Sequence, residues 1–176
     1  HDIDISTPLR ALLDKTGNEN AALIMSKEIS LHKYLPPHSN LEHTLDFAVR
    51  FGLLIVTEGV TIAPLQGVSE IKIKNNKDGS EYLSVSIAGP MRSAGGTESA
   101  VTMLIADHVR NAVGLSKYQA DCFDDETGRC VEELRSYESE AKQSFQFHVS
   151  DDDIKTVITN LPVELEGEGT DPVEVV

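Results

Sequence analysis

The sequence predicts a mixed α/β domain of the α+β kind, with N-terminal helices followed by a small sheet that contains a β-hairpin and a packed helix. Up to about residue 58 the apolar residues recur every three to four positions, as in amphipathic helices, and over 68–87 they alternate with the period of two typical of strands. With 176 residues, 40% hydrophobic and 25% charged, the chain is long enough to bury about 70% of its unfolded surface. We therefore expect one domain, with a mainly helical part (1–58) and an α/β part (59–176).

Three helices are expected in the helical part. The first has Pro8 in its opening turn, a favoured position for proline, and ends near Gly17. The second covers residues 20–34, before a Pro-Pro pair that breaks it. The third follows Ser39 as N-cap. Its apolar stripe predicts a central, largely buried helix and comprises Leu41, Leu45, Ala48, Val49, Gly52, Leu53 and Val56.

The segment 68–87 is expected to form the hairpin, since its two alternating halves flank the turn sequence Asn75-Asn76-Lys77-Asp78-Gly79. One face is aliphatic and is expected to meet the core: Ile71, Ile73, Leu83, Val85 and Ile87. The other is expected to face solvent: Lys72, Lys74, Tyr82, Ser84 and Ser86. With Lys77 in the turn, Lys72 and Lys74 form the most basic spot of the chain and are candidate contacts for a nucleic-acid backbone.

A glycine-rich turn over residues 88–97 joins the hairpin to a helix that is expected from Thr97 to Val113. Backbone N–H groups at such a helix start attract anions, so Arg92 and Ser93 are candidate phosphate contacts. The turn has neither the Gly-Lys-Ser/Thr ending of a Walker loop nor the glycine spacing of a dinucleotide fingerprint. The alternative is a purely conformational role for the motif residues Gly89, Pro90, Gly95, Gly96 and Thr97, which would let strand and helix pack closely.

The apolar stripe of this helix is expected to pack on the aliphatic face of the hairpin. It comprises Val101, Leu104, Ile105, His108, Val109, Ala112 and Val113. Because His108 lies on the stripe, a core histidine is favoured over a catalytic base.

The charge distribution argues against binding a polyanion over the whole surface. The net charge is −14, and the last 56 residues hold 16 acidic and 4 basic side chains, a balance of −12. The first 120 residues carry only −2. A nucleic-acid contact would therefore have to be local and use the first 120 residues. The plain alternative is that the acidic half is a solvated face.

No metal or catalytic constellation is evident. Cys122 and Cys130 match no zinc pattern, and Ser93 has no histidine or lysine near it in sequence. No apolar run approaches the roughly 18 residues of a membrane helix. We therefore expect no metal, no cofactor and no membrane contact for this chain, and a reduced, cytoplasmic setting. The polar opening without Met indicates a piece of a longer protein.

The ten-residue turn Ala88-Gly89-Pro90-Met91-Arg92-Ser93-Ala94-Gly95-Gly96-Thr97 resembles the N-terminal region of the large subunit of archaeal family D DNA polymerase (DNA polymerase II). The resemblance covers nearly everything from about residue 50 onward and the preceding helices more loosely. Further matching pieces occur in order at 57–60, 63–64, 67–68, 81–83, 107–110, 114–115, 132–133, 137, 162–164, 167–168, 170–171 and 173–175. Met91, in place of an isoleucine, and the two cysteines depart from the family pattern.

The resemblance implies a two-subunit replicative polymerase, which uses Mg²⁺-bound deoxynucleotides and has its 3′–5′ exonuclease in the small subunit. It also implies that the polymerase carboxylates lie far downstream of the matching region. We therefore expect no catalytic residue in this chain and no polymerase or nuclease activity from it alone.

Three functions from different classes remain. The first is a structural and docking module that packs on the remainder of the large subunit, within a complex that also holds the small subunit and DNA. The second is a local contact to the DNA backbone or a phosphate through Arg92, Ser93, Lys72, Lys74 and Lys77. The third is a small-molecule enzyme that uses the glycine turn; it is the least supported, because no nucleophile and base adjoin the turn.

Overall fold

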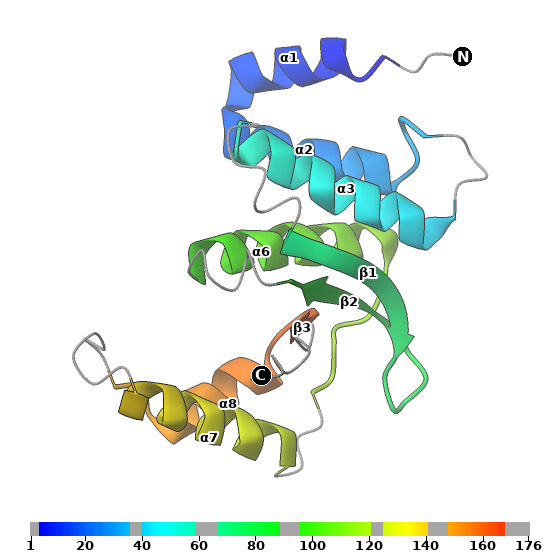
Figure 1. The fold of residues 1–176 in the computed structure, drawn as a ribbon. Coiled ribbons are helices and arrows are strands. Elements are labelled where there is room, and N and C mark those ends of the chain that lie inside the picture. The colour runs from blue at the N-terminus through cyan, green and yellow to red at the C-terminus, as the bar shows by residue number, and fades with distance from the viewer. Residues whose placement is uncertain are drawn as a thin grey trace, which may run out of the picture.

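The structure, a computed structural model, describes residues 4–35, 40–58, 67–88, 96–120, 125–140 and 148–167. Within these ranges, six helices and one three-stranded mixed sheet make an α+β fold, as the sequence predicted (Figure 1). The order is α1 (Ser6–Thr16), α2 (Asn18–Ser30), α3 (Leu41–Val56), β1 (Val68–Asn75), β2 (Glu81–Ile87), α6 (Gly96–Val113), α7 (Asp125–Glu140), α8 (Asp151–Thr159) and β3 (Glu164–Gly167).

The first three helices lie close to their predicted positions. The starts differ locally, and α2 ends at Ser30 instead of near residue 34. The carboxylate of Asp4 accepts hydrogen bonds from the Ser6 N–H at 2.9 Å and from the Thr7 side chain. These bonds, those from Ser6 first, lower the pKa of Asp4 to about 2. The predicted cap of α3 was wrong by one residue, because Asn40 rather than Ser39 accepts the N–H of Glu42, at 2.8 Å.

The predicted hairpin is confirmed. Strands β1 and β2 pair antiparallel, with Ile71 opposite Val85 and Ile73 opposite Leu83. Gly79 occupies the turn with a φ of +84°, which is a conformation that favours glycine. Strand β3 joins the other side of β2 in parallel, so β2 is the central strand in the order β1-β2-β3.

The core lies between the sheet and the helices α2, α3 and α6, so it joins residues from both predicted parts of the chain. Its fully buried members include Ile29, Leu45, Val49, Leu53, Leu83, Val85, Ile105, Val109 and Val163. Figure 1 shows α1 outermost, with α2 and α3 beneath it and α6 next to the sheet. Gly52 allows α3 to approach its neighbours closely, because a Cβ there would lie 2.3 Å from Ser26 Oγ and 3.0 Å from Ile105 Cγ2.

Several burial predictions were wrong. Leu104 is 59% exposed, because α6 packs against α2 and α3 as well as β2, and this arrangement buries an arc that contains Thr102, Ile105, Ala106 and Val109. His108, expected in the core, is only partly buried. Tyr82 and Ser84, expected in solvent, are buried. The added strand β3 and the ring of Tyr118, whose centroid lies 5.0 Å from that of Tyr82, surround this part of β2.

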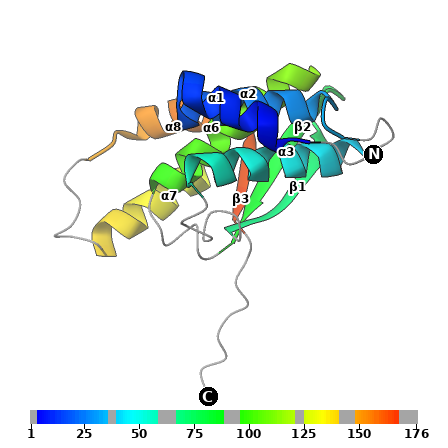
Figure 2. The ribbon, with the colours of Figure 1, turned by 90° about the horizontal axis from the view of Figure 1, so that it is seen from above.

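Helices α7 and α8 form a pair that packs mainly on itself, and α7 projects to one side of the helical layers (Figure 2). Arg135 of α7 joins the two helices through an ion pair with Asp151 of α8. It also forms an ion pair with Glu138 at 2.7 Å and donates a hydrogen bond to the carbonyl of Val149 at 2.6 Å. The acidic side chains over 125–140 and 151–153 thus lie on these two helices, whereas Glu164 and Glu166 lie on β3.

Candidate functional site

The lysines of the basic face predicted on the hairpin form ion pairs with carboxylates of the same domain. Lys74 of β1 reaches Glu164 at 2.9 Å and Glu166 at 2.7 Å, both on β3. Partial burial lowers the pKa of the Lys74 ammonium, but the hydrogen bonds to the two glutamates outweigh this effect and raise it. Lys72 pairs with Glu70 at 2.8 Å. Two of the three predicted lysines thus have their charge compensated within the domain.

The third lysine, Lys77, lies in the hairpin turn, which is itself tied to the segment after α6. The side chain of Asn76 donates to Ser80 Oγ at 2.9 Å and to the Lys117 carbonyl at 3.0 Å, and accepts from the N–H of Gln119 at 2.9 Å. From the sequence, Asn76 was assigned only to the turn, because Lys117 and Gln119 lie about 40 residues away along the chain.

Most of the glycine turn lies outside the described residues. Arg92, Ser93, Gly89, Pro90 and Gly95 lie outside the described residues, and Gly96 and Thr97 form the first turn of α6. The phosphate site on Arg92 and Ser93 therefore stays a prediction.

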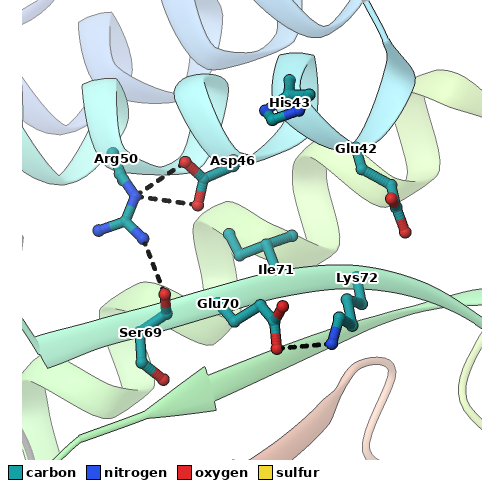
Figure 3. A pocket seen from close by; sticks show the side chains of 8 residues that line it. All are labelled: Glu42, His43, Asp46, Arg50, Ser69, Glu70, Ile71 and Lys72. Carbon is teal, nitrogen blue, oxygen red and sulfur yellow. Dashed lines mark hydrogen bonds and ion pairs between the residues drawn. The ribbon is translucent and has the colours of Figure 1, made fainter.

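A polar cleft of about 270 Å³ separates α3 from the outer edge of β1 (Figure 3). The Glu42 carboxylate accepts the N–H of Ile73 at 2.9 Å. Arg50 donates from Nε to both oxygens of Asp46 at 2.9 Å and reaches the Ser69 carbonyl at 3.5 Å. The helix thus satisfies outward-facing backbone groups of an edge strand that would otherwise be open to pairing with another chain.

The composition of the cleft does not suit an anion. Three carboxylates line it, Glu42, Asp46 and Glu70, together with two cations, Arg50 and Lys72. Each of these cations is ion-paired with one of the three carboxylates. The polar side chains of the cleft are therefore best explained by their bonds to the backbone of the edge strand, which they keep from pairing with another chain.

Neither a metal centre nor a membrane span is found in the described part of the chain. No group of three or more His, Cys, Asp or Glu side chains there is arranged to hold a metal ion. None of the helices in these ranges is both long and apolar enough to cross a membrane.

An apolar groove of about 380 Å³ lies between α1 and α3. Leu9 and Leu13 of α1 line one wall, and Phe51, Leu54 and Ile55 of α3 line the other. Asn18 and Glu58 also line it and are joined by a hydrogen bond of 2.7 Å from Asn18 Nδ2 to Glu58 Oε1. Apolar side chains thus form both walls of the groove, and the Asn18–Glu58 pair provides its polar side chains.

Large apolar side chains remain exposed around this groove. Leu54 is 40% exposed and Phe47, one turn before Phe51 on α3, is 39% exposed. The rings of Phe47 and Phe51 lie 5.7 Å apart, so the two form one aromatic surface. Helix α1 has no fully buried residue. The groove was not identified from the sequence, because the third helix was expected to be largely buried and no exposed apolar surface was assigned to it.

Comparison with known proteins gives the family. Over residues 1–176 the chain matches the family described as "DNA polymerase II large subunit DP2, N-terminal". It is 66% identical over 176 residues to the DNA polymerase II large subunit of Cenarchaeum symbiosum. It is 41% identical over 172 residues to that of Methanococcus maripaludis strain C5 and 40% identical over 172 residues to that of Thermoplasma acidophilum. These alignments cover 97–100% of the chain but only 15–16% of the relatives' own length. The chain therefore belongs to the family of N-terminal regions of the archaeal DNA polymerase II large subunit.

Proposed function

We propose that this chain is a non-catalytic packing module of the large subunit of a replicative DNA polymerase, and that it docks on the remainder of that subunit. The observation that carries the proposal is the open apolar groove between α1 and α3. A surface of this kind, lined by side chains such as Leu54, is typical of a site that another protein surface covers.

The energetic gain from covering this surface is substantial. Full burial of a large apolar side chain contributes about 1.5–3 kcal/mol. Leu54 and Phe47 are each exposed by about two fifths, so covering what remains exposed would contribute roughly 1 kcal/mol for each. The facing apolar side chains of the partner are buried at the same time, so the gain for the whole contact exceeds these two contributions.

The rival function, a local contact to DNA, has less support. Lys72 and Lys74 already neutralise carboxylates of the same domain, and a net charge of −14 repels a polyanion. Binding of Mg²⁺, deoxynucleotides and DNA, and association with an exonuclease subunit, are proposed for the whole polymerase and assigned to parts outside this chain.

The proposal is tested in the full-length large subunit that carries this sequence, with a specific protease site inserted after residue 176. After cleavage, the N-terminal part is expected to co-elute with the remainder in size-exclusion chromatography. Quantitative release of the N-terminal part at micromolar concentration would contradict a docking role.

The isolated chain is tested in parallel for the rival function with primer–template DNA across a salt series. If the chain is only a packing module, it is expected to show no specific affinity for this DNA and to incorporate no deoxynucleotides with Mg²⁺. A DNA affinity that falls with salt, by a slope of about −0.9 per phosphate contacted, would favour the backbone-contact function.

A further inference from the structure

We infer that the groove between α1 and α3 receives an amphipathic helix from the remainder of the large subunit, which carries a basic side chain where it passes Glu58. This inference rests on the proposed function and specifies the surface and the partner.

The walls of the groove require an occupant that satisfies its own backbone. Both walls belong to α-helices, whose N–H and C=O groups are bonded internally, and the lining side chains of Leu9, Leu13, Phe51 and Leu54 offer no hydrogen bond. An extended strand laid there would bury peptide groups that lose their hydrogen bonds to water and gain no partner. A helix has no such cost, since all its central peptide groups are already paired.

The spacing of the lining residues also suits a helix. Leu9 and Leu13 are four positions apart on α1, and Phe51 and Leu54 are three positions apart on α3. Phe47, whose ring adjoins that of Phe51, precedes it by four positions. Each wall is thus a ridge of side chains along a helix axis, and such ridges accept apolar side chains that recur at three to four positions on a third helix.

The carboxylate of Glu58 predicts a basic residue at one position of the bound helix. Glu58 lines the groove beside Asn18 and is the one ionisable residue among the described residues that line it. Its backbone is in the left-handed region with a φ of +54°, and its carboxylate is fixed by the hydrogen bond from Asn18. A lysine or arginine on the occupant would compensate this carboxylate as the groove closes, in a chain whose net charge of −14 favours basic partners.

The remainder of the subunit is the occupant favoured by length and by connection. The chain accounts for 15–16% of the length of its relatives, so most of such a subunit is tethered to it.

The test uses the cleavable full-length subunit with Leu54→Glu on one wall and Leu9→Glu on the other. We expect each variant to weaken retention of the cleaved N-terminal part by at least tenfold. The matched control is Val157→Glu, which places the same charge on α8 at a residue that is 61% exposed and does not line the groove. It is expected to leave retention unchanged. Glu58→Lys tests the electrostatic part and is expected to weaken retention while the isolated chain melts as the parent does.

The outcomes separate the two proposals. Release of the parent N-terminal part after cleavage overturns the proposed function. Retention that neither groove variant alters, with both folded by thermal melting, overturns only the groove assignment. Self-association of the isolated chain that Leu54→Glu abolishes, or loss of the small subunit in place of the N-terminal part, also overturns the inference, because the groove then serves another partner.

Discussion

The close approach of α2, α3 and α6 at Gly52 predicts that adding one methyl group there destabilises the fold. In Gly52→Ala the new Cβ would lie 2.3 Å from Ser26 Oγ, 3.0 Å from Ile105 Cγ2 and 3.3 Å from Ile105 Cδ1. Overpacking of this kind costs about 1–3 kcal/mol, whereas replacing glycine with alanine inside a helix gains about 1 kcal/mol. We expect the clash to win, with a net loss of about 1 kcal/mol and a Tm lower by about 2–4 °C.

The matched control is Gly128→Ala in α7, where a Cβ meets no atom within 4 Å. The same substitution is expected to raise stability there by up to about 1 kcal/mol, because only the helix-propensity gain remains. Both variants are measured by urea unfolding of the isolated chain. Ser26→Ala provides a third arm: it removes the nearest clashing atom, a hydroxyl that is buried with no hydrogen-bond partner in the described part of the chain. It should therefore reduce the cost of Gly52→Ala. Stabilisation by Gly52→Ala equal to that by Gly128→Ala would refute the packing argument.

Three further predictions concern the hairpin, the sheet edge and α1. Asn76→Ala removes a buried amide that joins the hairpin turn to the segment after α6, and the unfolding free energy should fall by about 1–3 kcal/mol; an unchanged urea midpoint would show that the tie is not needed. The double variant Glu42→Ala with Arg50→Ala frees the outer edge of β1, so sedimentation velocity should detect concentration-dependent oligomers that the parent does not form, whereas a monomeric double variant would show that the edge needs no seal. The lowered pKa of Asp4, about 2 against an ordinary 3.8, stabilises the start of α1 above pH 4, and this stabilisation is lost as the pH falls towards 2. The protection of the α1 amides, measured as exchange relative to the intrinsic rate at each pH, should fall over that window in the parent but not in Asp4→Asn.

The sequence predicted the elements whose signals are local. The hairpin follows from alternation around a turn that ends in Gly79, and α3 follows from a long apolar stripe that begins after a capping residue. These patterns depend only on residues within a few positions along the chain, so tertiary contacts do not alter the element that they predict.

The errors concern features that tertiary contacts decide. Tyr82 and Ser84 are buried because β3, some 80 residues later, pairs with β2 and makes it a central strand. The charge of Lys74 is compensated by Glu164 and Glu166 for the same reason. No local pattern distinguishes a lysine that faces solvent from one that crosses a sheet to a distant carboxylate.

The groove is a second feature that tertiary contacts decide, here for an apolar side chain that was expected to be buried and is exposed. Leu54 has the pattern of a core residue, and only the placement of α1 and α3 shows that its side chain lies at the rim of an uncovered groove. Exposure of an apolar residue is a property of the assembled helices and not of the stripe that predicts them.

The central claim is that this domain packs on the rest of its subunit through α1 and α3, and hydrogen–deuterium exchange tests it most directly. Helix α1 has no fully buried residue of its own, so its amides should exchange rapidly in the isolated chain. In the full-length large subunit the same amides should exchange at least tenfold more slowly, while those of the hairpin over 68–87 keep their rates. Equal exchange of α1 in both proteins, with new protection confined to the hairpin when DNA is added, would contradict the account.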